Sequence, residues 1–109
     1  MSQQARTLIV FFNLKEGVKE SEYLEWAKEV DLPTVSKLNS VSSFEVFKGI
    51  GIFGEQKASP WDFFEMIKIN SEDEFLADIQ TDVMSKVVEQ FQVFSKDATF
   101  ISTQDITTL

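Results

Sequence analysis

The sequence predicts an α+β fold in which a four-stranded antiparallel sheet and its helices follow one another in the order βαββαβ. Four segments are rich in strand-forming residues, two segments show helical spacing, and three of the four glycines lie in one stretch between elements. A chain of 109 residues has the size of one domain, so we expect residues 1–109 to form one folded unit.

The first half of the chain is predicted to contain a strand followed by a helix. The strand is placed at 6–14, because residues 8–12 form an unbroken run of Leu, Ile, Val and Phe. Over 19–32 the apolar period becomes helical, and four side chains share one face: Tyr23, Trp26, Ala27 and Val30. Pro33 disfavours helical geometry at Leu32, so we expect this helix to end or kink there.

The centre of the chain is predicted to contain two strands joined by a loop. Residues 42–48 alternate well enough between apolar and polar for a strand, and 61–69 form a third strand. Between them, 49–60 contains three glycines and a proline, which is typical of a loop.

The second helical segment is predicted to begin after Ser71, because Glu74 three residues later completes the sequence pattern of a capping box. Thr81-Asp82 favours a break that divides the segment into two helices. A last strand is predicted at 97–106, which is rich in Thr, Ile and Phe. The apolar stripe of the segment is predicted to contain Phe75, Ile79, Val83, Val87 and Phe94.

Charge and composition exclude several classes of function. With 10 basic and 18 acidic residues the net charge is −8, and no basic stripe with interleaved aromatic residues is present, so we expect neither nucleic acid nor membrane as a partner. The sequence contains neither Cys nor His, which excludes a Cys nucleophile, a His base and a Cys or His zinc site. We expect no cofactor and no metal. The expected location is the cytoplasm, because no spanning segment or disulfide framework is present.

The sheet face turned away from the helices is predicted to be too apolar for contact with water. In the first strand one row of alternate residues is wholly apolar, and the opposite row is still largely so: Thr7, Ile9, Phe11 and Asn13. Such a face is not expected to stay exposed on a soluble monomer, so we predict a homodimer in which two copies pack face to face. We assign the wholly apolar rows, including Phe64 and Met66, to the helix side. The mixed rows, with Asn13, Glu45 and Glu65, are assigned to a chamber between the two sheets.

Glu65 is the main candidate for a functional residue. A carboxylate between Phe63 and Ile67 is costly to bury unless it is paired, hydrogen-bonded or protonated. The functional interpretation is a general acid/base or a ligand anchor with a raised pKa. The structural alternatives are a strand end that reaches water, or an ion pair with Arg6, Lys48 or Lys68.

Other side chains are weaker candidates. Asn13 is either a group that polarises a substrate oxygen or a cap of the turn that follows it, and Glu45 repeats the reasoning for Glu65 on a shorter strand. Tyr23 and Trp26 are expected to pack between helix and sheet, although the phenol could reach a pocket rim. The remaining candidates are expected in the core, and in the wall of a pocket where one exists: Phe11, Phe47 and Phe63.

Three glycines match a dinucleotide-binding pattern without its required context. The segment GIGIFG at 49–54 fits G-x-G-x-x-G, but that fingerprint requires the loop to open a helix whose N-terminus holds the pyrophosphate. Here the segment leads to the predicted strand at 61–69. We therefore expect neither nicotinamide nor flavin, and interpret the segment as a loop that could lie over a pocket mouth.

Motifs along almost the whole chain resemble one known family. They are FFNLK at 11–15, Tyr23 and Trp26, DLPTV at 31–35, SV-x-x-FEVF at 40–47, the glycine-rich loop, SPWDFFE at 59–65 and FIST at 100–103. In this combination the chain resembles the RedY-like HapK family of the dimeric α/β-barrel (ferredoxin-like) superfamily. None of these motifs is by itself a catalytic signature.

The resemblance implies a homodimer whose sheets form a barrel, with a cavity in each subunit. It also implies a role in pathways that make prodigiosin-like and other pyrrole or indole pigments, as a cofactor-independent tailoring enzyme or a binder of intermediates. The matched polar positions are Asn13, Asp31 and Glu65, which adds Asp31 to the ligand-binding candidates. Because this chain has no His, a mechanism in which a relative uses a His base is not carried over.

Three interpretations follow. In the first, the chain is a cofactor-independent enzyme for an aromatic or heteroaromatic metabolite, in which Glu65 moves a proton or binds a substrate N–H and Asn13 polarises an oxygen. In the second, it is a non-catalytic binder or carrier of a poorly soluble pigment-pathway intermediate. In the third, it is a structural dimer with a filled barrel.

Overall fold

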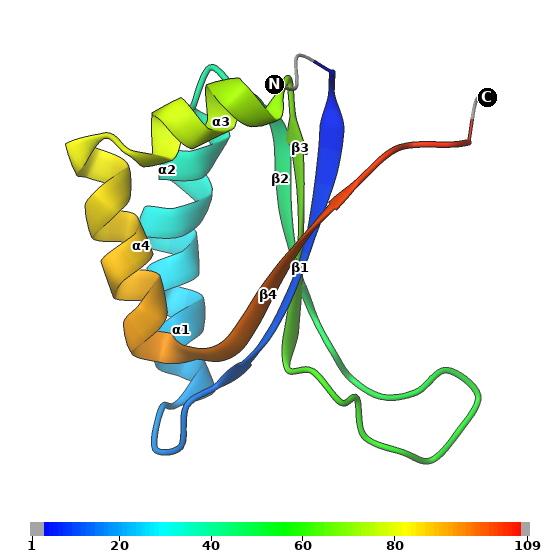
Figure 1. Ribbon diagram of the computed structural model, residues 1–109. Helices are drawn as coiled ribbons and strands as arrows, with labels where there is room; N and C mark the ends of the chain where they lie inside the picture. The colour runs from blue at the N-terminus through cyan, green and yellow to red at the C-terminus, as the bar shows by residue number, and fades with distance from the viewer. Residues whose placement is uncertain (1–3, 108–109) are drawn as a thin grey trace.

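The computed structural model describes residues 4–107 and contains a sheet with helices on one side (Figure 1). The strands are β1 (Arg6–Leu14), β2 (Val41–Lys48), β3 (Phe63–Ile69) and β4 (Ser95–Thr103). The helical elements are α1 (Glu20–Trp26), the π-helix η1 (Ala27–Asp31), α2 (Leu32–Ser36), α3 (Glu72–Ile79) and α4 (Asp82–Phe94). The strand order is β2-β3-β1-β4 and the pairings are antiparallel, which confirms the predicted α+β class and sheet.

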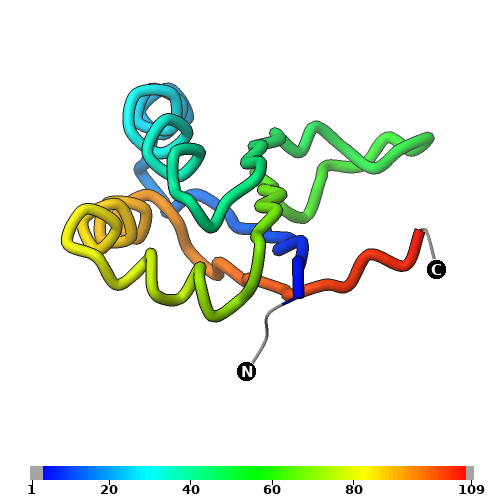
Figure 2. Tube along the Cα trace, turned by 90° about the horizontal axis from the view of Figure 1, so that it is seen from above, coloured from blue at the N-terminus to red at the C-terminus, as the bar shows by residue number. Residues whose placement is uncertain are grey.

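The helices form one layer and the sheet forms the other (Figures 1 and 2). The core lies between them, around the central strand β1, whose Leu8, Val10 and Phe12 are buried. The ring of Phe12 packs against the rings of Tyr23 and Phe91, at centroid distances of 5.4 and 4.9 Å. Burial of such rings provides much of the free energy that holds helices on a sheet.

The pairing register of β1 and β3 shows which alternate side chains of β3 join this core, and it contradicts the side of the sheet that we predicted for them. Leu8, Val10 and Phe12 lie opposite Ile67, Glu65 and Phe63. Directly paired residues in an antiparallel sheet project to the same face, so the mixed row of β3 faces the helices. Phe64 and Met66, which we assigned to the helix side, lie on the open face. In a single strand, both rows of alternate side chains are largely apolar, so the sequence does not show which row faces the helices. Only the pairing of neighbouring strands decides which row of one strand shares a face with which row of the next.

The first helical segment passes through Pro33 instead of ending before it. Pro33 has no N–H, and in a regular helix its ring would collide with the carbonyl of the residue four before it. The π-helix η1 introduces an extra residue at this point, and the N–H of Leu32 donates to the carbonyl of Ala27, five residues back. Helical structure then continues as α2 to Ser36.

The second helical segment is divided as predicted. The Ser71 side chain accepts a hydrogen bond from the Glu74 N–H at the start of α3, and Thr81 does the same for Met84 at the start of α4. Because a new helix begins after Thr81, the buried face of α4 does not continue the apolar face of α3. Met84 and Val87 are buried, whereas Val83 is exposed. The expected stripe was therefore wrong at Val83.

Two segments project from the sheet on the side opposite the helices (Figure 2). One is the loop between β2 and β3, and the other is the end of the chain at 104–107. The ends of the loop are held close together by a hydrogen bond from the Gly49 N–H to the carbonyl of Asp62. The approach is so close that a β-carbon at Gly49 would collide with the carbonyl of Trp61, which explains the glycine at this position. Both segments expose apolar side chains: Ile50, Phe53 and Ile106.

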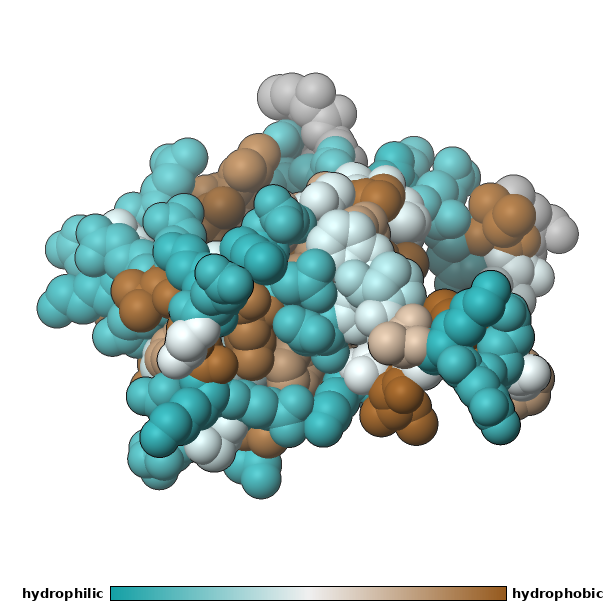
Figure 3. Space-filling view, turned by 90° about the horizontal axis from the view of Figure 1, so that it is seen from below, coloured by the Kyte–Doolittle hydropathy of each residue, from teal (hydrophilic) through white to brown (hydrophobic). Residues whose placement is uncertain are grey.

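Hydrophilic residues cover most of the surface at the end of the molecule shown in Figure 3, with apolar residues visible between them. None of the helices in residues 4–107 combines the length and the apolar character that a bilayer crossing requires.

Candidate functional site

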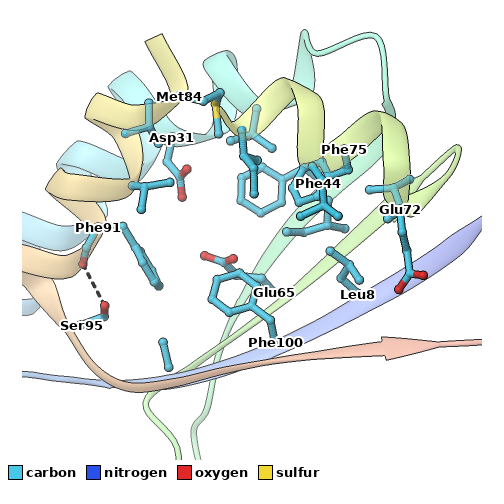
Figure 4. Close-up of a pocket in the computed structure, with 18 of the residues that line it drawn as sticks. Leu8, Asp31, Phe44, Glu65, Glu72, Phe75, Met84, Phe91, Ser95 and Phe100 are labelled. Carbon is cyan, nitrogen blue, oxygen red and sulfur yellow. Dashed lines mark hydrogen bonds between the residues drawn. The ribbon is translucent and has the colours of Figure 1, made fainter. Parts of the chain in front are cut away.

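A cavity of about 840 Å³ lies between the helices and the sheet. Its floor is the helix-facing side of the sheet, and its walls come from η1, α2, α3 and α4 (Figure 4). Most of its surface is apolar, with aromatic rings from four different elements: Phe44, Phe75, Phe91 and Phe100. A space of this size and character suits a small apolar organic molecule.

Glu65 stands on the cavity floor among apolar neighbours. On the sheet it is flanked by Val46 of β2 and Val10 of β1, and Phe100 of β4 follows Val10 in the same row. None of these side chains can donate a hydrogen bond. The residue is 4% exposed, and its Oε2 has no hydrogen-bond partner. An acceptor buried in this way is costly unless it is protonated or bound by something else.

The structural alternatives for Glu65 are wrong for the residues that the structure describes. Lys48 forms its salt bridge with Glu20, at 3.0 Å, and Lys68 is exposed on the open face. Arg6 donates to the carbonyl of Ala5. Glu65 does not reach water at a strand end either, because it occupies the middle of β3.

Asp31 enters the same cavity from the helical layer. It is the last residue of η1 and is 5% exposed. Although it occupies the N-cap position of α2, its side chain makes no capping hydrogen bond. Its carboxyl group points into the cavity toward Glu65 (Figure 4). Asp31 therefore enters the cavity at the end of a π-helix, an irregularity that is frequent at functional sites.

Burial raises the pKa of both carboxyl groups. The pKa of Asp31 rises to about 7 because its charge loses contact with water. The pKa of Glu65 rises to about 8, mainly through the same desolvation and further through repulsion from Asp31. The pair therefore retains a proton at neutral pH. Carboxyl groups of this kind can donate and accept protons near pH 7, as general acid–base catalysis requires.

Tyr23 is close enough to the two carboxyl groups for their charges to act on its hydroxyl. Its side chain is fully buried, its hydroxyl has no hydrogen-bond partner, and its ring packs on Phe63 at 4.7 Å. Burial first, and then the charges of Glu65 and Asp31, raise the pKa of this phenol far above its ordinary value of 10. Tyr23 is therefore a neutral hydroxyl, able to donate a hydrogen bond but not to act as a base.

The rim of the cavity lies between α3 and β4. The hydroxyl of Ser102 on β4 donates to Glu72 Oε2 on α3, at 2.6 Å, which joins the two sides. Leu76 and Phe100 line the cavity and are about half exposed, so they form part of its opening. Gln92 adds a neutral amide to the lining.

The structure brings some of the predicted site residues together and separates the others. Asp31 and Glu65 line the cavity, whereas Tyr23 and Phe63 are buried in the core and do not line it. Trp26 joins α1 to α4, where its Nε1 donates to Gln90 Oε1 at 2.8 Å. The remaining predicted residues do not line the cavity: Phe11, Asn13, Glu45 and Phe47.

Asn13 in particular has a structural contact of its own. Its Oδ1 accepts a hydrogen bond from the Asp62 N–H, and the Asp62 side chain accepts one from the Leu14 N–H. These contacts fasten the end of the long loop to β1. The expectation that Asn13 faces the same space as Glu65 is wrong, because Asn13 and Glu65 project from opposite faces of the sheet.

Several lining residues were not identified from the sequence as site residues. Those on α3 and α4 could have been inferred from the helical stripe, which does contain Phe75, Ile79 and Val87. No sequence signal distinguished the others from ordinary core residues: Leu8, Val35, Phe44, Met84, Phe91 and Phe100.

Comparison with known proteins identifies the family. A family model described as REDY-like protein HapK matches residues 6–106. The chain belongs to the HapK family. The resemblance found in the sequence motifs is thereby confirmed. No curated protein matches the sequence.

Solved structures confirm the fold of this HapK-family chain. HapK from Hahella chejuensis is 23% identical, with a TM-score of 0.77 over 94% of each chain. A hydroxynitrile lyase from Passiflora edulis is 11% identical, with a TM-score of 0.79 over 98% of each chain. A dimeric protein of ferredoxin-like fold from Bacteroides fragilis is 13% identical, with a TM-score of 0.65 over 96% of this chain and 100% of that chain. At these identities the likeness concerns the fold, which is ferredoxin-like.

Proposed function

We propose that this HapK-family protein is a cofactor-independent enzyme that acts on a small aromatic or heteroaromatic molecule held in the cavity. The observation that carries the proposal is Glu65, a buried carboxyl group with an unpartnered oxygen that faces an otherwise apolar space. Family membership supports a substrate of pyrrole or indole type from a pigment pathway such as prodigiosin biosynthesis.

In this proposal Glu65 transfers the proton and Asp31 adjusts its acidity. With a pKa of about 8, Glu65 is mostly protonated at neutral pH and donates a hydrogen bond or a proton to the substrate. Once ionised, it accepts a proton from a C–H or N–H of the substrate. The negative charge of Asp31 makes ionisation of Glu65 harder and so makes the ionised form a stronger base. The apolar lining holds the ring system and keeps water from the reacting atoms.

The proposal is tested by hydrogen–deuterium exchange, which detects proton transfer without knowledge of the natural reaction. The acetyl methyl protons of 2-acetylpyrrole and 3-acetylindole are followed by NMR in D₂O with the purified protein. We expect exchange faster than in buffer, by about 10²-fold or more, as for a positioned general base. The rate should increase with pH until Glu65 is ionised, near pH 8.

The variant Glu65→Gln should remove this exchange while changing the dissociation constant of either ketone by only a few-fold, because the amide keeps the shape of the carboxyl group. Glu89→Gln is the matched control, since Glu89 is exposed on α4 and does not line the cavity. Full exchange by Glu65→Gln would remove Glu65 from the mechanism.

A carrier of a poorly soluble intermediate is the second candidate function. The observation that favours it is the lining itself, which is apolar apart from a few side chains. A carrier would bind both ketones and leave their protons unexchanged. Binding without exchange by the unchanged protein would therefore support the carrier over the enzyme.

We also infer that two copies of the chain associate through the open face of the sheet. Its rows contain Ile9, Phe11, Phe64 and Met66, each only partly covered, and the more exposed Phe47 and Ile101. The loop between β2 and β3 and residues 104–107 project on this side, where they can contact a second copy (Figure 2). The Bacteroides fragilis protein of like fold is described as dimeric, which agrees with this inference. Sedimentation as a stable monomer would contradict it.

A further inference from the structure

The charged side chains that line the cavity all carry the same sign. They are Asp31 from η1, Glu65 from β3, and Glu72 and Asp73 from the first turn of α3. No Lys or Arg lines the cavity in the part of the chain that the structure describes. Lys48 and Lys57 form ion pairs away from the cavity, with Glu20 and Glu55. A ligand in this space therefore meets two buried carboxyl groups and, among the described lining residues, no Lys or Arg that compensates their charge.

We propose that the cavity selects ligands that carry a protonated amine on an apolar aromatic body, with the ammonium group held between Glu65 and Asp31. The inference rests on the proposed use of this cavity as the binding site. It adds the charge of the ligand, which neither family membership nor the fold supplies.

The unpartnered Oε2 of Glu65 is the independent observation that points to a polar group of the ligand at this place. A neutral ring N–H supplies one hydrogen bond and leaves the second carboxyl group unsatisfied. An ammonium group supplies three donors and a positive charge, so it can satisfy Glu65 and Asp31 together through charge-assisted hydrogen bonds. A carboxylate or phosphate would meet like charge once Asp31 and Glu65 are ionised, and no Lys or Arg in the described lining would receive it.

The aromatic rings of the cavity favour the same ligand. Phe91 and Phe100 are in edge-to-face contact, with centroids 6.3 Å apart, and Phe44 and Phe75 also line the cavity. Ring faces attract a nearby cation, most strongly where water is excluded. The same rings pack against the apolar body of the ligand.

Binding of a cation should release protons, and the affinity should therefore increase with pH. The titratable groups that face the site are Asp31 from η1, Glu65 from β3, Tyr23 from α1 and, at the rim, Glu72 and Asp73 from α3. Among the described lining residues, β1, β2, β4, α2 and α4 add no acidic or basic side chain. With pKa values of about 7 and 8, Asp31 and Glu65 hold protons at pH 6 that an ammonium ligand must displace.

The test compares three probes of nearly equal shape by calorimetry at pH 6, 7 and 8.5: 1-naphthylmethylamine, 1-naphthalenemethanol and 1-naphthoate. We expect the amine to bind at least about tenfold more tightly than the alcohol at pH 8.5, and the carboxylate to bind most weakly. The affinity for the amine should increase by about 10²–10³-fold from pH 6 to 8.5, because both carboxyl groups lose their protons over this range, and proton release is measured in buffers of different ionisation enthalpy. The affinity for the alcohol should stay nearly constant.

The variants Glu65→Gln and Asp31→Asn should each reduce the preference for the amine, and both should keep the affinity for the alcohol, which also shows that they fold. Glu89→Gln should behave like the unchanged protein. Equal binding of amine and alcohol would overturn the inference and leave the proposed function intact. A preference for the amine that persists without both carboxyl groups would also overturn it, because the cation would then be held at the rim. Failure of all three probes to bind would overturn the inference and the proposed function together.

Discussion

Replacement of Glu65 by Gln should stabilise the protein at alkaline pH. The folded chain keeps this carboxyl group away from water, among valines and without a hydrogen bond to Oε2, so the charged form is disfavoured in the folded state. In the unfolded chain the same group ionises near its ordinary pKa of 4.5. Gln has the shape of the protonated carboxyl group and carries no charge at any pH.

The sign and size of the effect follow from proton linkage. Below about pH 4.5 both states hold the proton, and the ionisation of Glu65 costs the folded state nothing. Between that pH and about 8 only the unfolded state has lost the proton, so the free energy of unfolding falls as pH rises, and above pH 8 the loss is complete. At about 1.36 kcal/mol for each pH unit between 4.5 and about 8, the full loss is on the order of 5 kcal/mol.

Urea unfolding at pH 5, 6.5 and 8.5 measures this, followed by tryptophan fluorescence at one protein concentration because association also stabilises. Glu65→Gln should exceed the unchanged protein by less than about 1 kcal/mol at pH 5 and by several kcal/mol at pH 8.5. For a slope of about 2 kcal/mol per molar urea, this is a midpoint shift of about 2 M. Glu89→Gln should stay within about 0.5 kcal/mol throughout. A difference between Glu65→Gln and the unchanged protein that does not grow with pH would refute the reasoning.

Two further predictions concern the core and the open face. Phe12→Ala should lower the free energy of unfolding by about 3–5 kcal/mol in urea titrations, because Phe12 is fully buried and packs against three other rings, whereas Phe12→Leu should cost clearly less. If both substitutions cost the same, loss of packed volume is not the cause. Phe47→Lys should raise the dissociation constant of the dimer at least about tenfold in sedimentation experiments, because it places a charge on the open face. It should leave amine binding in the cavity unchanged, and an unaffected dimer would place the interface elsewhere.

Much of the fold could be predicted from the sequence because its signals are local. Alternation and β-branched content marked the four strands, and the cap at Ser71 and the break at Thr81 are interactions between residues three apart. A helix end or a kink was predicted at Leu32, next to Pro33, whereas the structure has the π-helix η1 there, in which the Leu32 N–H donates to the carbonyl of Ala27, and helical structure continues beyond it. The start of the last strand was placed two residues late, at 97 instead of Ser95.

The candidate site could be predicted only in part. Glu65 was evident as a carboxyl group in an apolar row, which is unusual in any fold. Asp31 was suggested by its place in a family motif, and nothing in its neighbourhood in the sequence indicates burial. Asn13 and Glu45 had the same pattern signal as Glu65, yet they face away from the cavity because their strands pair in a register that turns them to the other side.

The sequence by itself determined the class of fold, the order of its elements and the family, because these depend on periodicity, caps and motifs that are read along the chain. It also limited any proton transfer to carboxyl groups, Lys, Tyr23 or the substrate itself, because the chain contains no His or Cys. Only the tertiary structure decided that the cavity lies between the helices and the sheet, and that Asp31 meets Glu65 inside it. The physical reason is that strand register and helix packing are long-range choices, which place residues 34 positions apart in the sequence within the reach of each other's charge.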